Sequence, residues 1–396
     1  MKRLKQQLYS DHIPVDLLIE IFSRLPRKSI DRIHCISKSL GYILRRPDFT
    51  ELFLTKSSTR PRLLLTVKAD GNLLFYSSPQ PQNPDDNSTL VATRYHTSFP
   101  ESFSSSYCCS TVCGLALLYE VGKRNVRVIC NPITGEFLTL PTVLRKDKTL
   151  AQVKAKGFKK AKAAVSGTCL GGYDPISKQL KELCVISSRG GGPNTHQVLT
   201  LESGKPLWRR IECEFHFKAR CMSDHICING VLYFRAKLGK SSVVVFFNVM
   251  SEKFGFINFD KDVRGEDDDG YDRDDGRLAL FNYKGKLGLR EGPAYGSTKH
   301  ELVLWVLEDA ANHKWSKLTY ELPRFLRSEQ FVGMSTGTGD ILFLPFPCFQ
   351  SKIDCLYFYN LQRKTVARVN IQGFEDLIFC SFFDIFLDYV ENFQFK

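Results

Sequence analysis

Tryptophan and methionine are scarce in this chain of 396 residues, which contains 3 and 4 of them, whereas phenylalanine and tyrosine number 30 and 15. Aromatic residues favour strands, so this balance predicts an interior built mainly from strands. Long apolar runs are also missing: Val243 to Phe247 is short, and the apolar C-terminal stretch is interrupted by Asp384 and Asp388. Because a membrane-spanning helix needs about 20 apolar residues, the sequence predicts a protein that does not cross a membrane.

The sequence also shows no secretory signal at its start, because Met1 to Lys5 lacks the apolar stretch that such a signal needs. The 13 cysteines are an odd number in a long chain, unlike the even sets that form the disulfide frameworks of small secreted domains. We therefore expect reduced thiols and a location in the cytoplasm and/or nucleus. The composition, with 43% hydrophobic and 24% charged residues, excludes wholesale disorder.

Positive charge is in excess, since 55 Lys and Arg against 42 Asp and Glu give +13, which raises a nucleic acid or another polyanion as a partner. The excess is local. Residues 145–162 hold seven lysines and Arg145 against Asp147, a net charge of +7, whereas residues 262–275 hold eight acids against two arginines, a net charge of −6. The sequence predicts that both segments are inserted surface loops, so the net charge argues little for nucleic acid as the main partner.

Helical periodicity is confined to the first 55 residues. In residues 11–26, apolar residues fall at i, i+1, i+4, i+5 and i+8, namely Leu17, Leu18, Ile21, Phe22 and Leu25. This spacing predicts an amphipathic helix that ends at Pro26. Ser29 offers an N-cap for a second helix that ends near Gly41, and a third is expected from Pro47. A unit of about 45 residues cannot bury such stripes alone, so we expect it to contact another surface.

From about residue 60, short runs of β-branched and aromatic residues alternate with turns rich in Gly, Asn, Asp and Ser, a pattern typical of an all-β domain. Four of these turns repeat weakly, each starting with an amide or an acid after a strand-like run: Asn131, Asp174, Asn248 and Asn360. Self-similarity at roughly 40 to 60 residues predicts a β-propeller, with five or six blades. A β-sandwich is the alternative, but about 335 residues is large for that fold.

The N-terminal segment contains a recognisable motif. Residues Ile13 to Ile30 resemble the start of an F-box, and Cys35 to Lys38 together with Arg45 to Phe49 resemble its end. The match covers about 40 residues nearly continuously. The family commonly has Trp where this sequence has Leu40, and loss of that ring would reduce packing within the motif and weaken binding of its adaptor.

The remainder is similar to the F-box-associated β-propeller domain of plant F-box proteins, through CGL at 113–115, NPITGE at 131–136, GYDP at 172–175 and ICINGVLY at 226–233. The resemblance implies a basic tail over 1–10, an F-box of three short helices over 11–55, and a kelch-like propeller over 56–396. The propeller would carry the basic loop 145–162 and the acidic loop 262–275.

The function that this resemblance implies is that of a substrate-recognition subunit of an SCF-type (Skp–cullin–F-box) E3 ubiquitin ligase. The F-box would bind a Skp-type adaptor and through it a cullin, and the propeller would bind a target protein for ubiquitination. The candidates for adaptor contact, carried over from the motif, are Ile13, Pro14, Leu17, Ile21, Leu25, Pro26 and Ile30. The alternative for several of them, Leu17 and Ile30 above all, is packing within the helical motif only.

No residue pattern predicts catalysis or a cofactor, because no His–Ser–Asp or His–Cys set lies in a recognised nucleophile context. Cys213, His216, Cys221 and His225 are zinc-ligand types, but residues three apart in a strand face opposite sides, so we predict no metal site. The expected mechanism is proximity, through effective concentration. Two other hypotheses are a propeller that binds RNA or another polyanion through residues 145–162 without ligase activity, and a propeller hydrolase with acids or His in its central channel.

Overall fold

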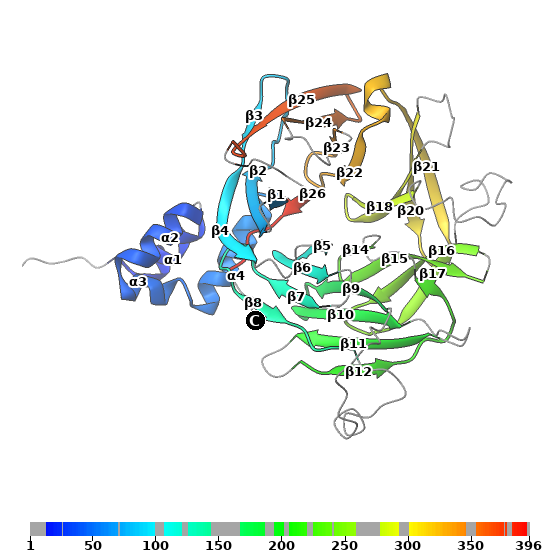
Figure 1. Ribbon diagram of the computed structural model, residues 1–396, viewed down its shortest axis with the longest axis horizontal. Helices are drawn as coiled ribbons and strands as arrows, with labels where there is room; N and C mark the ends of the chain where they lie inside the picture. The colour runs from blue at the N-terminus through cyan, green and yellow to red at the C-terminus, as the bar shows by residue number, and fades with distance from the viewer. Residues whose placement is uncertain are drawn as a thin grey trace, which may run out of the picture.

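The computed structural model shows a small helical domain attached to a ring of six β-sheets (Figure 1). The residues that the structure describes are 13–25, 27–69, 72–99, 107–120, 126–143, 167–186, 194–201, 206–219, 225–239, 241–258, 278–292, 301–345, 354–375, 377 and 382–393. The predicted tail 1–10, the basic loop 145–162 and the acidic loop 262–275 lie outside them, so the polyanion hypothesis stays a prediction. Among the described residues, no helix has the length and apolar character to span a membrane.

Four helices form the helical domain, defined here as residues 13–58: α1 (Val15–Ser23), α2 (Arg27–Ile36), α3 (Lys38–Ile43) and α4 (Pro47–Ser58). The predicted second helix is divided at Ser37, whose backbone is extended, with φ −148° and ψ 136°. Pro47 occupies the first turn of α4, where its missing N–H has no helical partner to lose. The core of the domain contains the fully buried rings of Phe49 and Phe53 together with Ile30.

The sheets are the six blades of a β-propeller, so the predicted propeller is confirmed and its blade number is six. Blade 1 contains β26 (Phe382–Tyr389), β1 (Arg62–Ala69), β2 (Asn72–Pro79) and β4 (Thr93–Phe99). Blade 2 contains β5 (Tyr107–Val112), β6 (Leu115–Glu120), β7 (Arg127–Cys130) and β8 (Phe137–Thr139). Blade 3 contains β9 (Gly167–Asp174), β10 (Gln179–Ile186), β11 (Thr195–Leu201) and β12 (Trp208–Ile211).

The other three blades follow in chain order. Blade 4 contains β13 (Lys218–Ala219), β14 (His225–Ile228), β15 (Val231–Leu238), β16 (Ser241–Asn248) and β17 (Phe254–Asn258). Blade 5 contains β18 (Leu278–Tyr283), β19 (Lys286–Glu291), β20 (Glu301–Asp309) and β21 (Lys314–Glu321). Blade 6 contains β22 (Gln330–Met334), β23 (Asp340–Leu344), β24 (Cys355–Asn360), β25 (Thr365–Gln372) and β3 (Thr89–Val91), and the 3₁₀ helix η3 (Arg324–Arg327) precedes it.

The ring is closed by strands from opposite ends of the propeller sequence. The innermost strands contact one another in the order β26, β5, β9, β14, β18, β22 and back to β26. Blade 1 takes its innermost strand from residues 382–389, which pair antiparallel with β1. The short strand β3, which lies between β2 and β4 in the sequence, pairs in parallel with β25 of blade 6. Blades 1 and 6 are therefore joined at the inside and at the outside of the ring.

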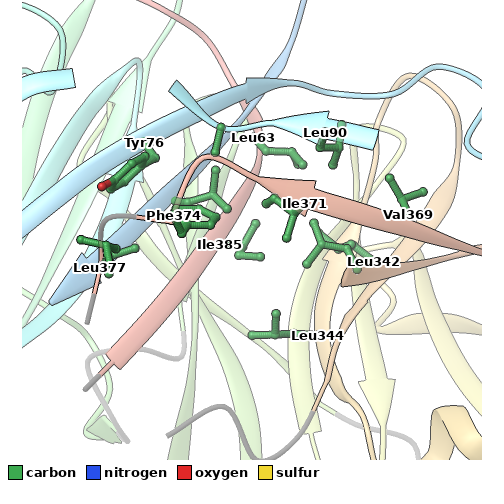
Figure 2. Packing of buried hydrophobic residues seen from close by; sticks show 14 of the residues in the cluster. Leu63, Tyr76, Leu90, Leu342, Leu344, Val369, Ile371, Phe374, Leu377 and Ile385 are labelled. Atoms are coloured by element: carbon green, nitrogen blue, oxygen red, sulfur yellow. The ribbon is translucent and has the colours of Figure 1, made fainter. Parts of the chain in front are cut away.

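Apolar side chains fill the spaces between neighbouring blades. The cluster between blades 1 and 6 takes residues from β1, β2, β3, β23, β24, β25 and β26, and Figure 2 shows Leu63, Leu90, Leu342, Val369 and Ile385 converging there. Leu63 and Leu342 are both 0% exposed. Full burial of such a side chain contributes about 1.5–3 kcal/mol, so each inter-blade cluster is a major part of the stability of the ring.

Short turns bound one face of the ring, which we call the turn face. Because successive strands of a blade are antiparallel, the first–second and third–fourth connections lie on this face, and the connections between blades lie on the opposite, crossover face. The four predicted turns are present, with Oδ atoms of Asn131, Asp174, Asn248 and Asn360 accepting backbone N–H bonds from residues two or three positions ahead. These side chains fix the turns locally, which is why the sequence could reveal them.

Candidate functional site

Helix α1 exposes apolar side chains on the side opposite to its buried ones. Leu17 and Ile21, one helical turn apart, are 55% and 47% exposed, whereas Ile19 and Phe22 lie in the core of the helical domain. Side chains four apart lie on the same helix face, so Leu17 and Ile21 form one surface. Ile13 and Val15 are exposed just before and at the start of the helix. We call the surface formed by Leu17 and Ile21 the α1 patch; exposed apolar residues on a small domain indicate a contact surface.

The structure separates the residues that the motif assigned to adaptor contact. Ile13, Pro14, Leu17 and Ile21 are exposed, so the alternative that Leu17 packs only within the helices does not fit its position. Ile30 requires a correction: it is 2% exposed within the core of the helical domain, where no partner can reach it, because α2 turns that side chain toward Phe49 and Phe53.

Leu25 and Pro26 are the other two residues that the motif assigned to adaptor contact. Leu25 is half-buried and packs against the core cluster of the helical domain. Pro26 lies outside the described residues.

Sequence reasoning missed three exposed apolar residues of the same domain. They are Val15, Ile36 and Tyr42, and Ile36 is exposed to 75%. Ile36 follows Ile30 and Ile33 at helical spacing, and this spacing alone would place its side chain on the buried face. The break at Ser37 ends α2 at Ile36, so the periodic argument does not extend to this side chain. The serine itself was the available signal, because Ser disfavours helix interiors and favours N-caps.

The end of α1 is fixed by side chains from the segment that leads into the propeller. Arg60 donates hydrogen bonds from Nη1 to the carbonyl oxygen of Arg24, at 2.7 Å, and from Nη2 to that of Ser23, at 3.0 Å. These bonds satisfy carbonyl groups that a helix end leaves unpaired. Within α1, the hydrogen bond from Arg24 lowers the pKa of the Glu20 carboxyl, and Lys56 of α4 adds a second cation 3.5 Å away.

The last described residues of the chain join the helical domain to the propeller. Phe393 packs against Phe53 of α4 edge to face, with ring centroids 4.5 Å apart, and against Phe49 at 6.0 Å. Asn392 is held on the turn face, where its Nδ2 donates to the carbonyl oxygen of Cys113 and its own carbonyl oxygen accepts from Asn131. The segment from β26 to Phe393 thus closes the ring and positions α4.

A second contact places α4 beside blade 3. Lys178, in the turn between β9 and β10, pairs with Glu51 of α4 at 2.7 Å, and both side chains are exposed. An exposed ion pair of this kind contributes little to stability, about 0–1 kcal/mol. Its position shows that α4 lies against the turn face. The helical domain therefore contacts the turn face, and α1–α3 lie outside the ring in Figure 1.

Leu40, at the position where the family commonly has Trp, is half-buried against the core cluster of the helical domain. Its side chain thus takes part in the packing that the larger ring would provide.

Cys213, His216, Cys221 and His225 are the residues of zinc-ligand type. Among the described residues, no group of three His, Cys, Asp or Glu is placed to hold a metal. Cys221 lies outside the described residues. Cys213 is near the carbonyl oxygen of Phe215, with its Sγ 3.2 Å away.

Comparison with known proteins identifies both parts of the chain. A model of the F-box domain matches residues 10–52, and a model of the F-box associated beta propeller domain matches residues 62–390. The chain belongs to the F-box proteins with an F-box-associated propeller. F-box domains generally bind Skp-type adaptors, and F-box proteins are in general non-catalytic subunits.

Full-length relatives agree with the match of both domains. The Arabidopsis thaliana relative At1g53370 is 42% identical, over 99% of this chain and 99% of its own. The F-box protein DOR of Arabidopsis thaliana is 40% identical, over 96% of this chain and 93% of its own. The chain is thus similar to plant F-box proteins across its whole length, which confirms the resemblance inferred from the motifs.

Proposed function

We propose that this F-box protein is a substrate-recognition subunit of an SCF-type E3 ubiquitin ligase. The observation that carries the proposal is the α1 patch, an apolar surface exposed by an F-box whose core is otherwise complete. The patch would bind a Skp-type adaptor, and the adaptor would bind a cullin. Amphipathic helices that present such anchors recognise partners through apolar contacts. The proposed location is the cytoplasm and/or nucleus.

The propeller would hold the target protein on its crossover face. Helix α4, Phe393 and the Lys178 turn place the F-box on the turn face, which leaves the opposite face for a second partner. The connections between blades begin and end at the crossover face, and such connections are where binding specificity is usually located on a rigid scaffold. The protein's contribution would be proximity without covalent chemistry, because a held target meets the ubiquitin-loaded enzyme at high effective concentration.

The adaptor contact is tested by co-purification of the full chain with a Skp-type adaptor. Leu17→Ala with Ile21→Ala removes two anchors of the α1 patch, and we expect adaptor affinity to fall at least tenfold, since each truncated anchor costs about 1–2 kcal/mol. The control is Ile176→Ala with Leu207→Ala, which truncates two apolar residues of the propeller that are 82% and 77% exposed. The proposal fails if the wild-type chain captures no adaptor, or if both double variants bind equally well.

Target binding requires a separate measurement. Affinity capture from plant cells with the proteasome inhibited would compare the wild-type chain with the Leu17→Ala, Ile21→Ala variant. Proteins captured by both forms and more abundant when the proteasome is inhibited are candidate targets, whereas the adaptor and cullin should be captured by the wild type alone. Equal recovery of the cullin by both forms would count against adaptor binding through the α1 patch.

A further inference from the structure

The innermost strands of the propeller surround a central cavity of about 780 Å³. Every blade contributes to its wall, through β26, β5, β9, β14, β18 and β22. Two glycines on this wall leave room for neighbouring side chains: a Cβ at Gly171 of β9 would meet the side chain of Leu117, and one at Gly333 of β22 would approach that of Leu387. A cavity of this volume lies within the range of small-molecule sites in proteins.

Polar side chains lie at both ends of this cavity, with Thr111, Asn282 and Asp388 toward the turn face. His225, Gln330 and Asp384 all line it, and each lies at or near the start of its innermost strand. The innermost strands start at the crossover face, so these three residues line the crossover half of the cavity. The middle of the cavity is largely apolar, with Ile226, Leu280, Phe331 and Phe386 among its lining residues.

The charge of the cavity is negative although the chain as a whole is basic. Its ionisable acids are Asp384 and Asp388, and its described lining contains neither lysine nor arginine. Asp388 is engaged: its Oδ1 accepts from Gln80 Nε2 at 2.8 Å and its Oδ2 from the backbone N–H of Thr336 at 2.9 Å. Within the described chain, Asp384 has no such bond, and no ion pair joins it to a described cation.

Among the described residues, no ion pair or hydrogen bond links the strands around Asp384 to its carboxylate. On β1, Thr66 lies opposite Asp384, and its buried hydroxyl oxygen has no hydrogen bond to a described residue. Lys68 lies opposite Phe382, two positions along β1. On β5 the nearest described ionisable lining group is Cys109, on β22 none is ionisable, and His225 faces the cavity from β14. Burial raises the pKa of Asp384 to about 7, so its carboxylate lies in a poorly solvated place.

We propose that the central cavity is a binding site for an alkylammonium or alkylguanidinium group, with Asp384 as the counter-ion. The cationic end would lie at the crossover half beside Asp384, and the alkyl arm would contact the apolar wall formed by residues such as Phe331 and Phe386. A cation offsets the cost of an ionised carboxylate in a low-dielectric site, which a neutral ligand of the same shape does not do. The proposal goes beyond ligase assembly and does not depend on it.

The site is tested on the full chain by titration calorimetry with n-butylammonium, n-propylguanidinium, n-butanol and butyrate. At pH 8 we expect both cations to bind at least tenfold more tightly than n-butanol, and butyrate not to bind. At pH 6, where about a tenth of a group of pKa 7 is ionised, the affinity for the cations should fall about tenfold. Equal affinities for n-butylammonium and n-butanol at pH 8 would overturn the proposal.

Variants assign the effect to Asp384. Asp384→Asn should reduce the affinity for n-butylammonium at least tenfold and remove its pH dependence, whereas Asp354→Asn, which neutralises an exposed acid of blade 6, should change neither. A thermal melt of each variant shows that it is folded. Cation affinity that survives in folded Asp384→Asn would refute the assigned counter-ion. Adaptor capture should be unaffected by this variant, so failure here is distinguishable from failure of the ligase proposal.

Two sources can supply the cationic group, a side chain of a target protein or a free small molecule. Lysine-containing and norleucine-containing tripeptides, both blocked at their ends, separate them. If the lysine peptide binds about as well as n-butylammonium and the norleucine peptide does not, the cavity accepts a basic side chain from a protein. If n-butylammonium binds and neither peptide does, the ligand is a small organic cation. If the two peptides bind equally well at pH 8, the proposed recognition of charge is wrong.

Discussion

Asp384 has a consequence for stability as well as for binding. Its folded-state pKa of about 7 is above the ordinary value of 3.8, so between these two pH values the folded chain holds a proton that the unfolded chain has released. Stability from this group is therefore present at low pH and is lost as the pH rises from about 4 to about 7.

Asp384→Asn should remove this loss. We expect the free energy of unfolding of the variant to exceed that of wild type by about 2 kcal/mol at pH 8 and to differ little from it at pH 4.5. The value at pH 8 is smaller than the whole rise in the Asp384 pKa would give, because solvent screens this partly exposed side chain. Urea unfolding at the two pH values measures the difference. Glu182, whose pKa burial raises to about 7 although Arg127 lies 3.3 Å away, contributes its own slope in both forms. Identical pH slopes for the two chains would contradict the expectation.

Individual residues differ in how far the sequence reveals their roles. Asn131 and Asn248 bond to the backbone of their own turns, so a local pattern was enough to predict those turns. Leu17 and Ile30 are both apolar residues at helical spacing, yet one is exposed and the other is buried. Periodicity identifies an apolar stripe but does not say whether the covering surface belongs to the same chain. In the sequence, Asp384 only interrupts an apolar run; its place in the cavity wall depends on the five other innermost strands, which come from distant segments.

At the scale of elements, the contact between the F-box and the propeller depends on Phe393, which is far from the F-box in the sequence. Phe393 is more than 330 residues away from α4 in the sequence, yet its ring packs on Phe53 and Phe49. No local pattern could predict this contact. Phe393→Ala should weaken the docking of α4 by about 2 kcal/mol, since it removes an aromatic group from a packed cluster.

Amide hydrogen exchange of the full chain checks this prediction. Amides of α4 should exchange about tenfold faster or more in Phe393→Ala than in wild type, whereas strands of blade 5 should be unchanged. Phe137→Ala, which truncates an exposed ring on β8, is the matched control and should leave α4 unaffected. Adaptor capture should persist in Phe393→Ala because the α1 patch is intact. Unchanged exchange of α4 would show that Phe393 does not hold the F-box in place.

At the scale of the whole molecule, the sequence revealed the architecture but not its closure. The change from helical to strand spacing divided the chain near residue 55, and repeated turns indicated blades. The blade number stayed at five or six because blade 1 draws β26 from the end of the domain and blade 6 draws β3 from its beginning. Such pairings join distant segments, and only the folded ring shows which strands meet.

Closure by β26 predicts that the ring unfolds as a unit when this strand is lost. A chain that ends at residue 381 would expose the edge of β1 and open the clusters that blade 1 shares with blades 2 and 6, to which Ile385 and Tyr389 belong. We expect it to lose its cooperative thermal transition and its near-ultraviolet dichroism. A chain that ends at residue 393 keeps β26 and Phe393 and should melt like wild type. Phe393→Ala keeps β26 and is the control for loss of F-box docking alone. If the 381-residue chain melts cooperatively within a few degrees of wild type, β26 is dispensable for the ring.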